Sequence, residues 1–518
     1  MTPNSPQRPI APAESWGFFL ARYGLPGMLG TALLTVGALG VGWLPLDTVV
    51  DSWPLVDVLR DSSGGLVLSR LMVFAGVAIL LQTWLVTGFD LLSGQRWDTG
   101  RMSALLACWS FPLLIAPPLF SRDVYSYFGQ GRLLLEGYDP YSTGVSVLPG
   151  WFTFGADPMW GETPTPYGPF FLLLSKGVAD FSGGQAFLAA LVFRLIAVIG
   201  LILMAVAVPK LAEQHGLDPA KSLWLAVLNP LVLMHFVAGA HNDALMVGLM
   251  LAGFALAIQK HAIYGAMLIA LAASVKPIAL LALPFIGLIW SGTVASFWRR
   301  VRDWIGVTVV AVITFGATAL LAGVGNGWIS ALSAPGAVKT WLSPPTALGM
   351  LVGGIMQFLG LADNNDQAVE FFRLIGLVAS LLIVAFLCLR PQGRSATRGA
   401  ALAFGAVVLL GPVIQPWYLL WVLPLFAVTG LSASQLRWTI LLTAAFAVHG
   451  MAESSATSDT VLEFSDLVAI LVAIGVVGLI LLASPRERRL VLRDPGAHGL
   501  IPQTPAAKAV ADSRIIVV

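Results

Sequence analysis

Charged residues are scarce in this sequence of 518 residues: they make up 11% of it, against about a quarter in an ordinary globular protein. Hydrophobic residues make up 57%, so the chain cannot present a largely polar surface to water, and a soluble enzyme is excluded. The formal net charge is only +2, from 29 basic and 27 acidic residues. No charge excess therefore points to nucleic acid or to a large anionic partner.

Cysteine is also scarce. Cys108 and Cys388 both lie in apolar runs, which argues against a disulfide framework and against a thiol-ligated metal site. A cleavable signal is lacking as well, because the first apolar run begins near Leu25, has the length of a full membrane span and has no convincing small-residue cleavage site. We expect this run to be a retained membrane anchor.

Long apolar runs, by contrast, are abundant. A helix needs about 17 to 25 apolar residues to cross a bilayer core, and the sequence predicts an all-α polytopic membrane protein with about 13 to 14 transmembrane helices. Two runs, Tyr167–Phe181 and Thr346–Gly360, are short or charge-bearing and are expected to be juxtamembrane or re-entrant helices on the outer face. The clearest spans are Leu25–Leu46, Leu71–Phe89, Ser103–Phe120, Leu195–Val208, Ser222–Gly239, Ala244–Gln259, Trp304–Val324, Leu374–Leu389 and Leu467–Ala483, with two more in 399–436, divided near Pro412, Gln415 and Pro416, one at Trp438–Ala452, and short ones on either side of Lys276-Pro277.

The positions of Lys and Arg predict which loops face the cytoplasm. If the N-terminus is cytoplasmic, the cationic loops all fall inside, and the opposite loops are poor in cations and often acidic. We therefore expect a multi-pass protein of the plasma membrane with five parts: a cytoplasmic tail (1–24), the first transmembrane helices (25–120), an extracytoplasmic catalytic loop with juxtamembrane helices (121–185), a transmembrane bundle (186–484) and a cytoplasmic tail (485–518). The inner groups are Arg96 and Arg101, Lys210 and Lys221, Lys260, Arg299–Arg302, Arg390–Arg398, Arg437 and Arg486–Arg493.

The longest predicted external loop, 121–166, holds the first candidate for chemistry, Asp123. Its carboxylate follows a predicted span directly and lies at the membrane surface, where it can act as a general base. Desolvation would raise its pKa and neighbouring Arg122 would lower it, so the sign of the shift stays open. Asp123 could equally cap the helix that follows. The loop is also rich in Tyr and Trp, Tyr127 among them, which suit either sugar stacking or an interfacial aromatic belt.

Further polar groups interrupt apolar helices at the same predicted face. His241-Asn242-Asp243 separates two spans and could be functional or could cap the next helix. Lys276 precedes Pro277 on a side that otherwise avoids cations, so it either binds an anion such as a lipid phosphate or extends to the headgroups. Arg194 lies inside a span and must be paired or face a polar cavity. Gln415-Pro416-Trp417-Tyr418 could line a sugar pocket or form a simple hairpin.

A cofactor is not predicted. The adjacent His241 and Asp243 are too few ligands to predict a metal site, and the external loop contains no DxD motif. Dependence on a divalent metal therefore stays open at this stage.

Taken in order, these motifs resemble the actinobacterial polyprenol-phosphate-mannose-dependent alpha-1,6-mannosyltransferases, members of the GT-C superfamily that build the mannan backbone of lipomannan and lipoarabinomannan. The similarity covers about Ser103 to Ala483. One departure is that the catalytic loop follows the third predicted span, whereas many GT-C enzymes have it after the first. The motifs are Ser121-Arg122-Asp123-x-Tyr125-x-Tyr127, Gly137-Tyr138-Asp139-Pro140-Tyr141, Pro166-Tyr167-Gly168-Pro169, His241-Asn242-Asp243, Lys276-Pro277 and Gln415-Pro416-Trp417-Tyr418.

The resemblance implies a GT-C fold, Asp123 as catalytic base, and a polyprenyl phosphomannose donor whose tail lies in the bilayer. From the residues themselves we expect inverting transfer to a lipid-anchored alpha-1,6-mannan acceptor, with Lys276 and Arg194 binding the donor phosphate. Expected partners are these substrates and membrane lipids, and no nucleic acid. Candidate sugar contacts are Tyr127, His241, Asn242, Asp243, Trp417 and Tyr418. A lipid or solute transporter, a membrane scaffold and a transferase of another lipid-linked sugar such as arabinose remain alternatives.

Overall fold

The computed structural model describes residues 15–46, 48–292, 295–331, 339–391, 393–452 and 500. These residues form helices joined by loops, and within them the only β-type pairing is an isolated bridge between Leu431 and Leu500. The predicted all-α class of membrane protein is confirmed. The predicted span Leu467–Ala483, the first 14 residues and nearly all of the predicted C-terminal tail lie outside the described residues.

Five helical stretches of the described chain are long and apolar enough to cross a membrane. They are Trp16–Val41, which comprises α1 (Trp16–Phe19), η1 (Leu20–Gly24) and α2 (Leu25–Val41), then α4 (Ser63–Leu92), α8 (Ala186–Gln214), α13 (Phe297–Ala322) and α16 (Asp366–Leu389). A sixth results if η5 (Val232–Ala238) and α10 (Asp243–Ile258), bent by 112°, count as one broken span.

The other helices of the described chain are shorter, and η marks those with 3-10 or π geometry. They are α3 (Pro54–Arg60), α5 (Thr99–Ser110), η2 (Phe111–Ile115), α6 (Asp123–Leu135), η3 (Val145–Val147), η4 (Pro158–Trp160), α7 (Pro169–Phe181), α9 (Pro219–Ala226), α11 (Ala262–Val275), η6 (Pro277–Ala282), α12 (Leu283–Ser291), α14 (Trp328–Ala331), α15 (Pro344–Phe358), α17 (Ala396–Leu410), η8 (Pro416–Tyr418), α18 (Leu419–Ala427) and α19 (Ala433–Ala452).

Prolines explain two places in the described chain where a predicted span is not a continuous α-helix. Proline lacks an amide hydrogen and its ring clashes with the preceding turn, so a continuous apolar run breaks where it occurs. The predicted span Ser103–Phe120 stops being α-helical at Ser110, just before Pro112, and Ser222–Gly239 is interrupted at Asn229-Pro230. The predicted breaks between helices at Lys276-Pro277 and near Pro416 are both present, where the 3-10 helices η6 and η8 begin.

Close backbone contacts hold the helices together. A side chain on Gly200 of α8 would lie 2.3 Å from the carbonyl oxygen of Ala244, and one on Gly248 of α10 would lie 2.3 Å from the carbonyl oxygen of Gly200. Small residues matter in membrane helix packing, because lipid tails are as apolar as leucine and close approach must supply the attraction. These two glycines fix the start of α10, where Asp243 lies, against α8.

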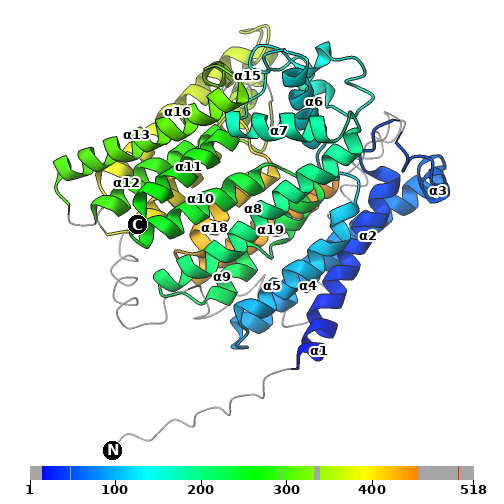
Figure 1. Ribbon diagram of the computed structural model, residues 1–518, viewed down its shortest axis with the longest axis horizontal. Coiled ribbons are helices and arrows are strands. Elements are labelled where there is room, and N and C mark those ends of the chain that lie inside the picture. Colours follow the sequence, from blue (N-terminus) through cyan, green and yellow to red (C-terminus); the bar gives the residue numbers. More distant parts are fainter. Residues whose placement is uncertain are drawn as a thin grey trace, which may run out of the picture.

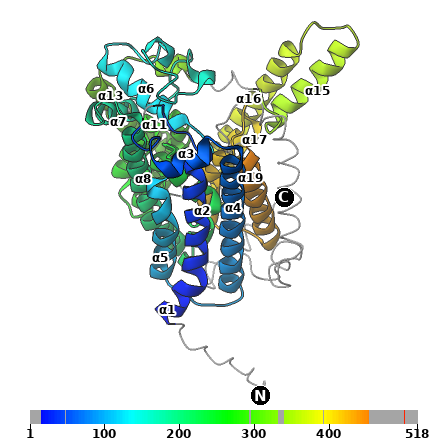
Figure 2. The same ribbon diagram turned by 90° about the vertical axis from the view of Figure 1, so that its right-hand side faces the viewer.

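The two ends of the bundle differ. Figure 2 shows α1 at the lower end, and α6 and the α15–α16 hairpin at the upper end. In Figure 1, α7 lies across that same upper end, where it packs against α6, α11 and α13. Neither α7 nor α15, the two helices predicted not to cross the bilayer, is among the candidate spans.

Candidate active site

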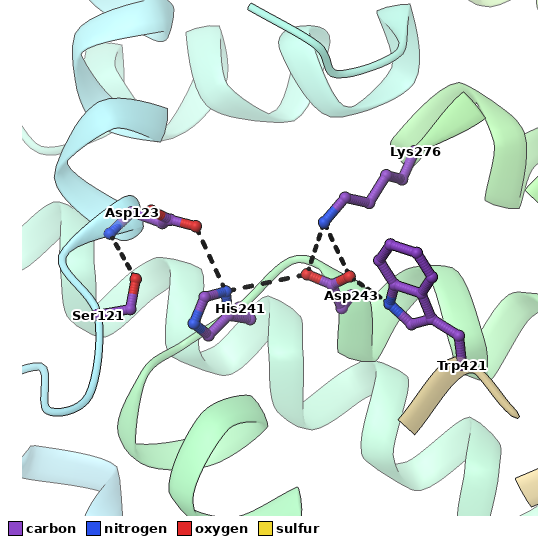
Figure 3. Close-up of polar contacts among 6 residues, drawn as sticks. All are labelled: Ser121, Asp123, His241, Asp243, Lys276 and Trp421. Carbon is purple, nitrogen blue, oxygen red and sulfur yellow. Dashed lines mark hydrogen bonds and ion pairs between the residues drawn. The ribbon is translucent and has the colours of Figure 1, made fainter. Parts of the chain in front are cut away.

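Four interruptions of the helical bundle meet at its upper end and bring together side chains far apart in the sequence (Figure 3). Asp123 begins α6, and His241 and Asp243 lie in and just after the break between η5 and α10. Lys276 ends α11, and Trp421 lies on α18, which follows η8. Asp123 of the predicted external loop therefore lies in one polar cluster with the predicted His241-Asn242-Asp243 and Lys276-Pro277 motifs, and the cluster includes Trp421, which the sequence analysis did not single out.

Asp123 does not cap its helix. The N-cap residue of α6 is Arg122, and Asp123 is the first helical residue, its amide donating to Ser121 Oγ at 3.1 Å. One carboxylate oxygen, Oδ2, lies 3.6 Å from His241 Nδ1. The Asp123 side chain is 19% exposed, whereas His241 and Asp243 are fully buried. Asp123 is thus the carboxylate of the cluster that a substrate can reach.

The pKa of Asp123 is raised to about 6, chiefly by burial of the carboxyl group. The negative charges of Asp157 and Asp243 raise this pKa further, and Lys276 and the Ser121 hydrogen bond lower it. Arg122, the neighbour expected to oppose the shift, instead pairs with Asp157 at 3.5 Å and lies over the ring of Trp43 at 4.3 Å. A carboxylate with this pKa is largely ionised at neutral pH and is a stronger base than an ordinary aspartate.

Asp243 links the cluster together. Its carboxylate accepts hydrogen bonds from Lys276 Nζ at 2.8 and 3.0 Å and from Trp421 Nε1 at 2.6 Å. His241 Nδ1 lies 3.8 Å from its second oxygen. Asn242, the N-cap residue of α10, makes no side-chain capping bond. The Asp243 carboxylate therefore pairs with side chains of α11 and α18 rather than with the amides of α10.

Lys276 does not extend to the lipid headgroups. Besides its pair with Asp243, its Nζ lies 5.7, 5.6 and 5.1 Å from the ring centres of Tyr167, Tyr418 and Trp421. Aromatic faces attract a cation, so the rings hold the ammonium group in place. The side chain is 15% exposed, and an ammonium group has three donors of which Asp243 takes two. Lys276 therefore keeps capacity for an external anion.

Several buried polar groups beside this cluster have no hydrogen-bond partner. They include both ring nitrogens of His241, the amide group of Asn242, Trp417 Nε1 and Tyr127 Oη. The rings of Trp417 and His241 lie against each other at a tilt of 32°, with centres 4.3 Å apart. An unsatisfied buried polar group costs about 1 to 3 kcal/mol. Such groups gathered at one place favour a polar ligand that would pair with them.

His235 belongs to the same group and was missed by the sequence analysis. It is fully buried on η5, both of its ring nitrogens lack a partner, and its ring centre lies 5.4 Å from that of Trp417. The π geometry of η5 has no sequence signature, and the segment resembles an ordinary span. An ionisable residue within an apolar run was the signal that could have found it.

Two of the predicted site residues make contacts of another kind. Tyr127 is fully buried and packs edge-on against Tyr167, Phe171 and Phe193. Arg194 is fully buried and donates to the carbonyl oxygens of Val237, Ala238 and Leu114 at 2.9 to 3.1 Å. Arg194 thus fastens the end of η5, just before His241, to η2. Its binding to a donor phosphate stays a prediction.

Backbone strain is concentrated at this site. Three non-glycine residues of the described chain have positive φ, and two of them flank the cluster: Phe120 at 66° and Ala240 at 52°. Such conformations cost about 1 to 3 kcal/mol and persist only where the surrounding structure enforces them. Phe120 precedes Asp123 by three residues, and Ala240 directly precedes His241, so both strained residues help to place the site.

No group of three or more His, Cys, Asp and Glu side chains is arranged to hold a metal ion in the part of the chain that the structure describes. The chemistry that the described cluster can perform with its own residues is acid–base and electrostatic. Asp123 can accept a proton, and Lys276 can stabilise negative charge.

Comparison with known proteins gives two matching family models. Residues 24–292 match the alpha-(1->6)-mannopyranosyltransferase N-terminal domain, and residues 345–483 match the MptB C-terminal domain. A probable alpha-(1->6)-mannopyranosyltransferase of Mycolicibacterium smegmatis is 34% identical, over 95% of this chain and 94% of its own. Alpha-(1->6)-mannopyranosyltransferase A of Mycobacterium tuberculosis is 35% identical, over 77% and 79%. Alpha-(1->6)-mannopyranosyltransferase B of Corynebacterium glutamicum is 29% identical, over 77% and 71%. No solved structure matches the chain.

Proposed function

Because this chain belongs to the family of alpha-(1->6)-mannopyranosyltransferases and is a mannosyltransferase, we propose that it transfers mannose from polyprenyl phosphomannose to the 6-hydroxyl group of a lipid-anchored alpha-1,6-mannan acceptor. The transfer inverts the anomeric carbon, from a beta-linked donor to an alpha-linked product. It extends the mannan of lipomannan and lipoarabinomannan at the extracytoplasmic face of the plasma membrane. The actinobacterial source of the relatives fits this role in the cell envelope.

The observation that carries this proposal is the arrangement of Asp123 and Lys276. They lie on either side of the His241 and Asp243 pair (Figure 3), and both side chains remain partly exposed. Inverting transfer needs a base on the acceptor side of the sugar and charge stabilisation on the leaving-group side. An acid and a cation on opposite sides of this pair meet both needs.

In the proposed reaction, Asp123 removes the proton from the acceptor hydroxyl as its oxygen attacks the anomeric carbon. The bond from that carbon to the phosphate oxygen breaks, and the phosphate leaves with its electron pair. Lys276 binds the departing phosphate with the donor that Asp243 does not take. Asp243 and the three aromatic rings keep the ammonium group of Lys276 in position, and the unpartnered groups of His241, Asn242 and Trp417 are available to the sugar hydroxyls.

The direct test is incubation of the purified protein with polyprenyl phosphomannose and a short alpha-1,6-mannoside. Mass spectrometry should detect an acceptor heavier by one hexose, and digestion with a linkage-specific mannosidase should identify the new alpha-1,6 bond. Parallel incubation with polyprenyl phosphoarabinose tests the alternative donor. Pentose transfer without hexose transfer would contradict the proposal.

The pH dependence of transfer should follow Asp123. Because the ionised carboxylate is the active form, kcat/KM should fall about tenfold per pH unit below an apparent pKa of about 6. In Asp157→Asn this acid limb should move to lower pH, since a neighbouring negative charge that raises the pKa has been removed. Initial rates measured from about pH 4.5 to 8 would show both effects. An acid limb near pH 4 in the unaltered enzyme would mean that Asp123 is not the titrating group.

Trp417 offers a test of the sugar contacts. Trp417→Phe keeps an aromatic ring against His241 but removes the unpartnered Nε1 donor, so transfer should fall about threefold to tenfold, the value of one hydrogen bond. The thermal unfolding temperature should fall only slightly, because no protein hydrogen bond is lost and the smaller ring removes only part of the buried volume. Trp298→Phe, at a tryptophan that is 77% exposed on α13, is the matched control and should keep full activity. Equal loss in both variants would remove Trp417 from the site.

A further inference from the structure

Several of the helices that meet at the site are too short to cross a membrane. Four of them begin or end at site residues or at the loop that carries Trp417: α10 with 16 residues, α11 with 14, the pair η6–α12 with 15 and α17 with 15. Near its other end each helix has cationic residues: Lys260 in the loop between α10 and α11, Arg299 and Arg300 in the first turn of α13, or the group from Arg390 to Arg398 at the start of α17. The lengths of these helices therefore give the distance from the cationic residues to the site.

This distance is shorter than the membrane is thick. At 1.5 Å per residue, α11 is about 21 Å long and α10 about 24 Å. The hydrocarbon core of a bilayer is about 30 Å thick. If the cationic loops lie at one boundary of the core, Asp243 and Lys276 lie about 6 to 9 Å inside the other boundary. Helix tilt only increases this depth.

Two long helices beside the site, α13 and α16, also indicate that the site lies below the membrane surface, because both continue beyond it. Ser274, two residues before Lys276, accepts a hydrogen bond from Thr318 Oγ1, and α13 continues four residues beyond Thr318, or about 6 Å. On α16, Gly376 packs against the carbonyl oxygen of Leu410, where α17 ends. From Gly376, α16 continues for ten more residues to Asp366, or about 15 Å.

The part of α16 that rises beyond the site pairs with α15 to form an apolar hairpin, visible at the upper right of Figure 2. The base of α15 is tied to the loop before Trp417, because Ser343 Oγ donates to the carbonyl oxygen of Gly411 and Thr346 Oγ1 to that of Pro412. The helix α15 carries no charged residue. The exposed side chains of the hairpin include Leu348, Leu351, Ile355, Phe358, Phe371 and Leu374, each at least 45% exposed.

The tip of the hairpin is polar. Lys339 Nζ donates to Asn365 Oδ1 at 2.9 Å and is paired with Asp366, and Asp363 and Asn364 lie in the same loop. The half of α16 that pairs with α15 carries two charged residues: Glu370, one turn below Asp366, and Arg373, which donates to Thr346 Oγ1 at the base of α15. A charged tip above the uncharged, exposed apolar face of α15 is the pattern of a segment that ends at the lipid headgroups. In water, the same stem would expose a large apolar surface at high cost.

We propose that the reaction centre is a recess within the leaflet on the site's side of the membrane, below the level of the headgroups. The α15–α16 hairpin forms one wall of this recess, and its exposed apolar face is covered by the acyl chains of that leaflet. The inference rests on the proposed function only in naming the donor. A donor phosphate must then descend from the headgroup region to meet Lys276, which favours entry from the bilayer side. The ammonium group of Lys276 offsets the cost of removing the phosphate from water.

Depth measurement by spin labelling tests this arrangement without requiring activity. Single cysteines at Leu351, Ile355 and Phe358 would be labelled in the full chain, reconstituted in lipid vesicles, with Cys108 and Cys388 replaced by serine and alanine. Collisions of each label with oxygen, which concentrates in lipid, would be compared with collisions with an aqueous nickel chelate. A label at Ile313, 66% exposed at the middle of α13, is the lipid-facing reference.

We expect oxygen collisions to dominate at Leu351, nearest the base that adjoins the site, and to weaken through Ile355 to Phe358 at the tip, where the headgroups begin. Dominant collisions with the nickel chelate at Leu351 would place the hairpin in water and overturn the proposal. Protection from both reagents would mean that a second copy or another segment covers the hairpin, which also overturns it. Because no transfer is measured, these outcomes are independent of whether the proposed mannosyl transfer is correct.

Discussion

Replacement of Asp123 by asparagine should lower mannosyl transfer about 100- to 10,000-fold, the usual cost of losing a positioned general base. The amide has nearly the same shape as the carboxyl group, and its Oδ1 can still face His241, so the packing of α6 should survive. Product formation by purified protein at saturating donor and acceptor is the measurement. The loss should appear in kcat, because the carboxylate accepts its proton only as the acceptor hydroxyl attacks.

Glu162→Gln is the matched control for this experiment. It makes the same carboxylate-to-amide change in the same loop, at an exposed residue, and should leave transfer unchanged. Thermal unfolding of the Asp123→Asn variant should match that of the unaltered protein closely, because the carboxylate takes part in no short ion pair: its approach to His241 is 3.6 Å, and an amide oxygen can keep its hydrogen bond with Ser121. Near-normal transfer by Asp123→Asn would remove this residue from the role of base.

Breaking the pair of Asp243 and Lys276 should have the largest effect on stability. Removing one partner of a buried ion pair typically costs about 3 to 5 kcal/mol, because the remaining charge stays buried without compensation. Lys276→Met leaves the Asp243 carboxylate, which is fully buried, with Trp421 as its only hydrogen-bond donor. Asp243→Asn leaves the ammonium group of Lys276 facing aromatic rings alone. Thermal unfolding in detergent should show both losses, and transfer should fall with them.

The double variant Asp243→Asn/Lys276→Met separates stability from function. With both charges removed, most of the lost stability should return, since a neutral pair carries no desolvation penalty of this size. Transfer should remain at the level of the Lys276→Met variant, because no cation is left for the leaving phosphate. Recovery of transfer together with stability would mean that the pair is structural and that Lys276 does not bind the donor.

Part of the site could be predicted from the sequence because membrane chemistry makes polar residues conspicuous. Asp123, His241, Asp243 and Lys276 each interrupt an apolar run, and charge is costly at membrane depth, so their placement on one face could be inferred from loop charges alone. The division of the chain at Pro277 and near Pro416 follows from the missing amide hydrogen of proline. His235 was missed because the π geometry that places it beside Trp417 has no sequence pattern.

Composition and periodicity by themselves determined that this is an α-helical membrane protein, and local motifs determined which residues are candidates for chemistry. The tertiary structure decided which of those candidates pair with one another. The sequence left Lys276 in need of an anion and Asp123 with a pKa shift of unknown sign. The fold supplied Asp243 to the lysine from 33 positions away, and it buried Asp123 while directing Arg122 to Asp157. Pairings of this kind depend on which helices meet, and that is set by long-range packing such as the glycine contacts of α8 with α10, which local sequence does not encode.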